Sequence, residues 1–395
     1  MSDLELLFLV LALIYIWECA CWVPRGSVAF RTWFGSHWRA AHPGGLLGNQ
    51  RGGFIFAHPF PPLGTFLTAT QFPLSLSSEA VLGYVASSIN PGARPAQSGN
   101  FFRFDDIRTV EAAGKKVRVN GQVLLQEASG RLAERLAEQM RELSRLDPAK
   151  RESVLESMAR ASLDTKALKG RWEHFKLLSA NVRLLANSLF GYLFLFAPFL
   201  IWHLGLSGCW LGLLSGLLAL TFATALVFRR AHETLYPPAQ DERFTHFLTI
   251  LLSPATTLRA HDVLSRPLLE TFHPLALAKV FCAERQFRAF ARRVLLEIRY
   301  PALPVCPREE AEAQATERYS RAVLRKAVEK FLKQSGLDPE ELAQPPAPAD
   351  ETCRSYCPRC LAQFTTREGV CADCGGLALI SFSAAAAIQE QKGGR

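Results

Sequence analysis

Three long runs of apolar residues divide the chain, and each is long enough to cross a lipid bilayer as a helix. They are residues 4–23, 184–202 and 206–228. About 20 apolar residues in helical conformation span a hydrocarbon core of about 30 Å. The first run begins beside Asp3 and Glu5, with no Lys or Arg, and no small-residue cleavage site follows it. The pattern therefore predicts a retained transmembrane helix and not a cleaved signal peptide.

Basic residues flank these runs on one side only. Arg25 follows the first run, several Lys and Arg precede the second, and Arg229 and Arg230 follow the third. No Lys or Arg lies between Arg183 and Arg229. Because Lys and Arg collect on the cytoplasmic side of a membrane, we expect the N-terminus outside and a helical hairpin with an external turn at 203–207. An integral protein of the bacterial inner membrane is the predicted class.

Small residues recur every four positions in the third run, at Gly208, Gly212 and Gly216. Glycines at this spacing let two transmembrane helices approach closely. Two interpretations follow. The stripe packs against another span of the same chain, which we favour because three spans already supply neighbours, or it forms a homodimer. Membrane lipid is the other partner that these spans predict.

Between the first and second runs the pattern becomes strand-like. Residues 24–53 are basic and aromatic and predict a juxtamembrane segment at the interface. Short alternating runs then extend to residue 126, and Asn120-Gly121 between two of them predicts a tight hairpin. Leu132, Leu136, Met140 and Leu143 follow at helical spacing and predict an amphipathic helix.

This order of strands and helix resembles a known architecture. The stretch FRFDDIRTVEAAGKKVRVNGQVLLQ followed by SGRLAERLAEQMREL is similar to bacterial pleckstrin-homology-like domains, and the resemblance extends over residues 54–145. It implies a cytoplasmic binding or scaffolding domain and not catalysis. A small α+β domain of another type is the alternative.

The remaining cytoplasmic stretches predict helices. Asp147-Pro148 has the form of a helix start. Phe244–Leu252 is apolar but too short to cross, which predicts an interfacial or re-entrant helix. His273-Pro274 begins a basic helix reaching about Arg299, suited either to the anionic inner leaflet or to packing within the protein.

One cluster of residues carries the types needed for catalysis. His261, Asp262, Glu270 and His273 combine imidazole and carboxylate groups, which could move a proton or bind a substrate at the inner leaflet. No HExxH or nucleophile motif accompanies them. Capping or interface histidines are the alternative, and we favour it.

Four cysteines near the C-terminus form two CxxC pairs. They are Cys357 and Cys360 in CPRC, and Cys371 and Cys374 in CADCGG. Two such pairs can place four thiolates at the corners of a tetrahedron, as a closed structural zinc site requires. The module resembles a zinc ribbon, and its four protein ligands leave no open position on Zn²⁺. Cys353 is a weaker ligand candidate.

Composition adds two constraints. The formal net charge of +9 follows the membrane topology, so it gives little support to nucleic-acid binding. A thiolate metal site, with the other six of the ten cysteines scattered, fits a reducing compartment, so we expect the ribbon in the cytoplasm.

The predicted fold class is a multidomain membrane protein, with transmembrane helices, a cytoplasmic α+β domain and a small zinc ribbon. The predicted segments are a transmembrane helix 1–23, a juxtamembrane segment 24–53, the α+β domain 54–146, cytoplasmic helices 147–183, a transmembrane hairpin 184–228, a cytoplasmic or interfacial helical region 229–342, a Pro-rich linker 343–352, the zinc ribbon 353–383 and a disordered tail 384–395.

Three functions compete. The first is a membrane scaffold or adaptor that binds a protein or lipid partner. The second is a membrane enzyme that uses the His261 to His273 cluster, and the third is nucleic-acid binding by the ribbon. The absence of catalytic motifs favours the scaffold.

Overall fold

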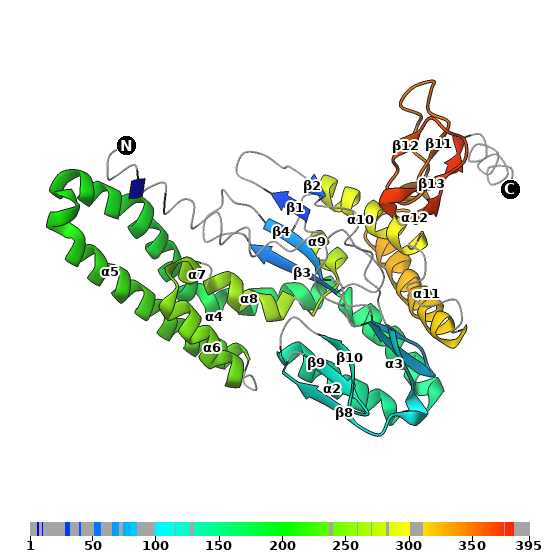
Figure 1. The fold of residues 1–395 in the computed structure, drawn as a ribbon, viewed down its shortest axis with the longest axis horizontal. Coiled ribbons are helices and arrows are strands. Elements are labelled where there is room, and N and C mark those ends of the chain that lie inside the picture. Colours follow the sequence, from blue (N-terminus) through cyan, green and yellow to red (C-terminus); the bar gives the residue numbers. More distant parts are fainter. Residues whose placement is uncertain are drawn as a thin grey trace. The chain divides into compact units, whose positions relative to one another are not determined.

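The computed structural model divides the chain into two compact units (Figure 1). Unit 1 comprises Met1–Ala41, Gly52–Thr68 and Thr165–Val280, and unit 2 comprises His42–Arg51, Ala69–Asp164 and Phe281–Arg395. The structure describes residues 6–7, 10, 28–31, 39–40, 51–56, 65–70, 74–84, 99–114, 116–126, 130–236, 240–258, 260–269, 271–281, 284–300, 311–374 and 376–382. Most of the predicted first span and the tail from residue 384 lie outside these residues.

Two long helices dominate unit 1. Helix α4 (Thr165–Gly191) continues through a π-helical segment (Tyr192–Phe196) into α5 (Ala197–Leu235). Gly205 breaks α5 with φ 69° and ψ 155°, a conformation that glycine adopts without steric penalty. The chain reverses there, so that α4 packs against the second part of α5. Gly205 lies within the turn predicted at 203–207.

Four shorter helices follow the hairpin. They are α6 (Gln240–Leu252), α7 (Pro254–Leu258), α8 (Ala260–Leu269) and α9 (Pro274–Phe281). Helices α6 and α8 pack on the hairpin through a core that includes Phe175, Phe228, Ile250 and Leu264, and α7 packs on it through Leu258. The Tyr236 hydroxyl at the end of α5 donates to the Leu264 carbonyl at 2.7 Å. Helices α6, α7 and α8 therefore form one bundle with those ends of α4 and α5 that the sequence predicts to be cytoplasmic.

A small antiparallel sheet contains residues from both sides of a predicted boundary. Its strands, in the order β2-β1-β4-β3, are β2 (Arg39–Ala40), β1 (Val28–Arg31), β4 (Thr65–Thr70) and β3 (Arg51–Phe56). The predicted boundary between residues 53 and 54 falls inside β3. The basic juxtamembrane segment thus shares a sheet with residues that we assigned to the next domain.

The α+β core of unit 2 contains two three-stranded antiparallel sheets and a helix. The strands are β5 (Leu74–Leu76), β6 (Ala80–Tyr84) and β7 (Gly99–Arg103) in one sheet, and β8 (Val110–Ala113), β9 (Lys116–Val119) and β10 (Gln122–Gln126) in the other. Asn120 and Gly121 both have positive φ, 49° and 78°, which confirms the predicted tight turn between β9 and β10. The alternation of short runs had not indicated β6.

The two sheets share one core with helix α2 (Gly130–Ser144). Leu136 and Met140 of its predicted apolar stripe pack against Val81, Phe104 and Leu124. The sheets approach closely, because a Cβ on Gly83 would collide with Leu124. The close approach requires glycine on β6.

A buried arginine on the following helix, α3 (Pro148–Ser162), completes this core. The side chain of Arg151 is 5% exposed and its guanidinium lies 4.6 Å from the centre of the Phe104 ring. It donates to the carbonyls of Leu143, at 3.1 Å, and Ser78, at 2.6 Å. One cation thus links α3, the end of α2 and the turn before β6.

Three helices join the α+β core to the C-terminal module. They are α10 (Glu284–Arg299), α11 (Ala311–Gln334) and α12 (Pro339–Leu342). The sequence predicts one helix from His273 to about Arg299, whereas the structure describes α9 and α10 separately. The apolar face of α10, including Phe287 and Phe290, is buried. This burial agrees with packing inside the protein, one of the two roles predicted for that helix.

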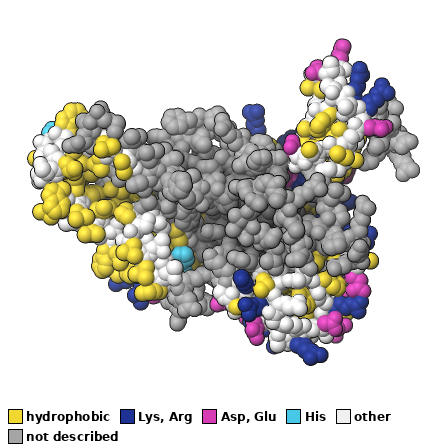
Figure 2. Space-filling model, viewed as in Figure 1, with side chains coloured by type: hydrophobic (Ala, Val, Ile, Leu, Met, Phe, Trp, Pro, Cys, Tyr) yellow, Lys and Arg dark blue, Asp and Glu magenta, His cyan; other side chains and the backbone are white. Residues whose placement is uncertain are grey.

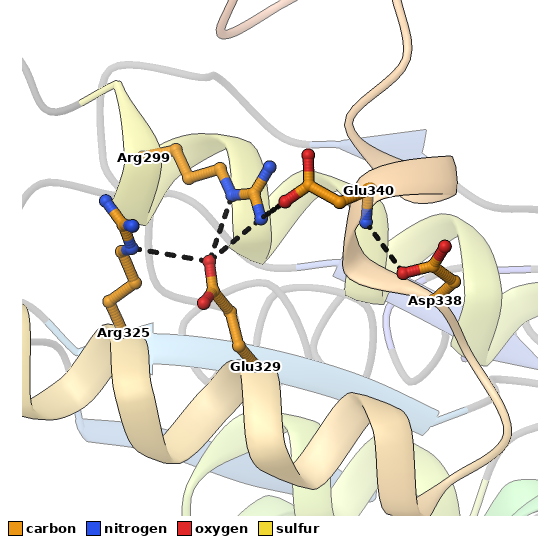
Figure 3. A network of polar contacts seen from close by, with 5 residues as sticks. All are labelled: Arg299, Arg325, Glu329, Asp338 and Glu340. Atoms are coloured by element: carbon orange, nitrogen blue, oxygen red, sulfur yellow. Dashed lines mark hydrogen bonds and ion pairs between the residues drawn. The ribbon is translucent and has the colours of Figure 1, made fainter. Parts of the chain in front are cut away.

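A network of charges fastens these three helices together (Figure 3). Arg299 of α10 contacts Glu329 of α11 at 2.9 Å and Glu340 of α12 at 2.7 Å. Arg325 also reaches Glu329, at 3.3 Å. Asp338 caps α12 by accepting from the Glu340 amide at 3.1 Å. The network fixes the point from which the chain leaves α12 toward the cysteines.

Candidate metal centre

Short strands hold the four cysteines of the C-terminal module. The strands are β11 (Ser355–Tyr356), β12 (Gln363–Phe364), β13 (Val370–Cys371), β14 (Leu377–Ala378) and β15 (Ile380–Ser381). They form a three-stranded sheet in the order β12-β11-β15 and a separate pair, β13-β14. Cys357 directly follows β11 and Cys371 ends β13. Each CxxC pair therefore begins at the end of a strand.

The two pairs converge on one point. The sulfur atoms of Cys357, Cys360, Cys371 and Cys374 all lie within 4.8 Å of one another, and those of Cys360 and Cys371 are 3.7 Å apart. A tetrahedral thiolate site with metal–sulfur bonds of about 2.3 Å separates its sulfurs by about 3.8 Å. Three of the four side chains are buried and Cys360 is half-buried. The cluster could hold a metal ion, and its donor set fits one.

The backbone makes a similar hydrogen-bonded turn around each pair. The Leu361 amide donates to the Cys357 carbonyl and the Gly376 amide to the Cys371 carbonyl, both at 2.9 Å. Leu361 and Gly376 both have positive φ, 63° and 87°. Glycine takes this conformation readily, whereas Leu361 takes it at a steric cost. The two turns are therefore similar in shape although only the second contains glycine.

The thiols differ in acidity. A hydrogen bond from the Cys360 thiol lowers the pKa of Cys357 to about 5, and the backbone amides of Cys360 and Arg359 act in the same direction. The same thiol–thiolate bond raises the pKa of Cys360, and burial raises that of Cys374 to about 12. Cys357 is therefore the thiol that loses its proton most readily, and a bound cation would displace the protons from Cys360 and Cys374.

A buried arginine inside the first CxxC pair escaped the sequence analysis. Arg359 is 6% exposed, although charged residues between knuckle cysteines usually face water. It lies close enough to Glu297 of α10 to affect that carboxyl electrostatically. Burial raises the pKa of Glu297 to about 6, while Arg293 and Arg359 act to lower it. The charge of Arg359 was visible in the sequence, but its proximity to Glu297, 62 residues earlier in the chain, was not.

The Pro-rich linker is held at several points. Arg292 of α10 donates to the Gln344 carbonyl at 2.8 Å. The Gln363 side chain donates to the Ala347 carbonyl at 2.8 Å and accepts from the Ala349 amide at 2.7 Å. The linker therefore connects the helices and the cysteine module by fixed contacts.

The two described histidines of the predicted catalytic cluster contact other parts of the protein. His261 is in contact with Ser179 of α4, with the ring nitrogen 3.3 Å from the hydroxyl, and its ring lies edge-on to Phe175. His273 caps α9, because its Nδ1 accepts from the Leu275 amide at 3.2 Å. Burial lowers the pKa of both to about 4. The Asp262 side chain and Glu270 lie outside the described residues.

Each histidine thus has a packing or capping contact with residues other than its predicted partners. Neutral buried histidines with such contacts are common in protein cores. No catalytic dyad links His261 to His273 among the contacts of the described residues.

The chain was also compared with known proteins. It matches no protein-family model, and no curated protein or solved structure is significantly similar to it. The cysteine cluster and the apolar hairpin are therefore the features from which function has to be argued.

Proposed function

We propose that this protein is an integral membrane scaffold or adaptor. In this proposal the α4–α5 hairpin anchors the chain in a bilayer, and a zinc ribbon on the cytoplasmic side presents a binding surface to a protein partner. The observation that carries the proposal is the combination of a lipid-compatible hairpin and a four-thiolate site that has no position left for a substrate.

The hairpin surface supports membrane insertion. Thr165–Leu235 is long and apolar enough to cross a membrane, and only 22% of its most apolar window is buried. A helix in the core of a water-soluble protein would hide most of such a window. Here large apolar side chains face outward, Trp202 with 77% of its surface exposed. Figure 2 shows hydrophobic side chains gathered over the α5 part of the molecule. Gly205 then lies at the external turn, and both ends of the hairpin lie in the cytoplasm.

The donor set of the metal centre supports zinc. Four thiolates at tetrahedral separations suit Zn²⁺, which has no preference for an open or planar geometry in structural sites. Four protein ligands make the ion structural, because none can be replaced by substrate. About 30 residues with few apolar side chains bury too little area to fold alone, so the metal supplies much of the stability of the module.

One edge of the ribbon supports partner binding. Residues 365–369 form an exposed loop between β12 and β13, and Val370 begins β13. Val370 is 61% exposed and is the large apolar side chain that the described part of the ribbon leaves in water. A partner that covers this side chain would remove apolar surface from water, which favours binding.

The α+β core of unit 2 is compatible with a second binding module. Two three-stranded antiparallel sheets with α2 packed against them support the pleckstrin-homology-like resemblance. In this proposal the module binds a protein or a lipid head group, and no catalytic step is assigned to it.

Affinity capture from detergent-solubilised membranes tests the proposal. The wild-type chain, Val370→Asp and a chain lacking residues 343–395 are compared, with Thr365→Asp as the control because Thr365 is exposed on the loop before β13. We expect one partner to be captured by the wild type and by Thr365→Asp, and lost with the other two.

Capture of the same proteins by all four chains would overturn the adaptor function of the ribbon. If none of the four chains captures a partner, the enzyme hypothesis becomes the better explanation. Ala replacement of His261 and His273 then tests it, because an enzyme should lose its activity without losing its fold.

A further inference from the structure

Unit 1 contains a second apolar helical hairpin beside the proposed membrane anchor. From Phe244 to Leu258 the chain has no Asp, Glu, Lys or Arg, whereas Asp241, Glu242 and Arg243 precede this stretch and Arg259 follows it. The apolar stretch is too short to cross a bilayer. The charged groups at both ends therefore have to reach the same water interface, which the long side chain of Arg259 can do from within the bilayer.

The contacts of α7 place this stretch deep alongside α4 and α5. Leu258 packs in a cluster with Leu189, Leu193, Leu217 and Leu220. Leu220 precedes Arg229 by nine residues, which is about 13 Å along a helix. Leu193 follows Arg183 by ten residues, or about 15 Å. The cluster therefore lies within the cytoplasmic half of a hydrocarbon core of about 30 Å, and Leu189, only six residues from Arg183, marks its shallow side.

From Phe244 on, the outer face of α6 carries no charged residue and is exposed; the Thr249 hydroxyl on this face donates to the Thr245 carbonyl at 2.8 Å. Its inner face packs on α5, with Phe247 and Ile250 in the same core as Phe228. Phe244 and Leu252, near its two ends, are 67% and 77% exposed. The hydrophobic surface in Figure 2 continues from the α5 part of the molecule to the α6 part. The exposed face of α6 is therefore continuous with the surface proposed to face lipid.

The polar groups at the tip of this hairpin bond within it. The Thr257 hydroxyl donates to the carbonyls of Ile250, at 2.5 Å, and Ser253, at 2.9 Å. The Ser253 hydroxyl accepts from the amide and the hydroxyl of Thr256 at 3.2 and 3.0 Å. Pro254 has no amide hydrogen to satisfy. A broken helix can lie at membrane depth only if its polar groups find partners in the protein, and this tip meets that condition.

We infer that residues 240–258 form a re-entrant membrane segment. Helix α6 enters the cytoplasmic half of the bilayer beside α5, the chain turns at Ser253-Pro254 within that half, and α7 and α8 return to the same side. The partner of the exposed α6 face is lipid acyl chain. This inference rests on the proposed membrane anchoring of the α4–α5 hairpin.

Thiol labelling in native membranes tests the inference. Three single replacements are made in the full chain: Leu252→Cys at the tip, Leu177→Cys on α4 before Arg183, and Ser207→Cys in the external turn. Leu177 is the matched control, because it is also 77% exposed. A membrane-impermeant maleimide is applied to right-side-out and inside-out vesicles, and labelled peptides are identified by mass spectrometry, which separates them from the native cysteines.

We expect Leu177→Cys to react only from the cytoplasmic side and Ser207→Cys only from the outside. Leu252→Cys should react at least tenfold more slowly than Leu177→Cys from either side, and should become reactive in detergent. Reaction of Leu252→Cys from the cytoplasmic side at the rate of Leu177→Cys would overturn the inference. A thiol at position 252 that stays unreactive in detergent would also overturn it, because protein would then cover the site.

The proposed anchoring fails separately, if Ser207→Cys and Leu177→Cys react from the same side. A charge test gives a second measure: Leu252→Lys should lower the yield of membrane-integrated protein several-fold, whereas Leu177→Lys should leave it nearly unchanged. Equal yields would contradict lipid exposure of α6.

Discussion

The hydroxyl of Tyr192 lies 2.5 Å from the point where a Cβ on Gly216 would stand. That hydroxyl donates to the Leu213 carbonyl at 2.7 Å, so the tyrosine crosses from the first arm of the hairpin onto the second. Gly216 is therefore needed for contact within the hairpin. Gly212 differs, because a Cβ there would meet nothing within 4 Å in the described structure.

We predict that Gly216→Ala destabilises the hairpin by about 1–3 kcal/mol, as overpacking of a close contact does. Gly212→Ala should be neutral for the monomer. Thermal unfolding in detergent, followed by size-exclusion chromatography, measures both effects. If Gly212→Ala instead dissociates a dimer without changing monomer stability, the homodimer interpretation of the glycine stripe gains support.

Metal content should distinguish the four clustered cysteines from Cys353, the other cysteine of the C-terminal module. Purified full-length protein should contain one zinc per chain, and Cys371→Ser should lose most of it because three thiolates bind more weakly than four. Cys353→Ser is the control, since Cys353 lies outside the cluster. Elemental analysis after gel filtration gives the stoichiometry. Unchanged zinc in Cys371→Ser would contradict the four-thiolate site.

Removing the Arg151 side chain should damage the α+β core. Arg151→Met retains apolar bulk but leaves the Leu143 and Ser78 carbonyls without this donor, so we expect a loss of about 2–4 kcal/mol in the free energy of unfolding. The exposed Asp105 adds little, because its ion pair with Arg151 is screened by water. Arg145→Met, at an exposed position, is the control. Denaturant unfolding monitored by circular dichroism compares the two, and equal stabilities would refute the core role.

His273 should make unit 1 sensitive to acid. Its pKa is about 4 in the folded protein, below the ordinary 6.5, so the unfolded state binds the proton more strongly. Stability is therefore retained above about pH 6.5 and lost as the pH falls toward 4, by on the order of 2–3 kcal/mol. His273→Asn, which can still cap α9 but cannot titrate, should weaken this pH dependence. Thermal unfolding at pH 7.5 and 5 measures it.

His174→Asn is the control for that experiment, because His174 is exposed on α4. It should leave the pH dependence as in the wild type. If His273→Asn behaves in the same way, the buried imidazole does not cause the acid sensitivity.

Gln363 should protect the linker from proteolysis. Gln363→Ala removes both of its contacts with Ala347 and Ala349, so we expect cleavage within residues 343–352 to accelerate several-fold in limited proteolysis. Gln334→Ala, on the exposed face of α11, is the control. An unchanged cleavage rate would mean that other contacts hold the linker.

Local sequence patterns predicted the features that depend on neighbouring residues. The turn at Asn120-Gly121 requires two positive φ angles, and the position of Pro148 at the start of α3 follows a similar local rule. The two CxxC pairs predicted a convergence that the structure contains. Each of these depends on a conformational preference or a spacing within a few residues.

Contacts between distant residues could not be predicted in the same way. The sequence shows Arg151 on a helix of mixed charge, and only the fold brings it against Phe104. Strand β6 was missed because its residues AVLGY carry no alternation of apolar and polar positions. The Pro-rich composition of residues 343–352 predicted a linker, but the contacts that hold it come from Gln363 and Arg292, which lie outside its own segment.

The contacts of the linker have a mechanical consequence. A partner that pulls on the ribbon could extend the segment between α12 and the cysteines only a little, because Arg292 and Gln363 hold it by hydrogen bonds near its two ends. The load would therefore pass into α10 and the charge network around Arg299. Binding of a partner to the metal module could therefore exert a force on the helices that carry the module.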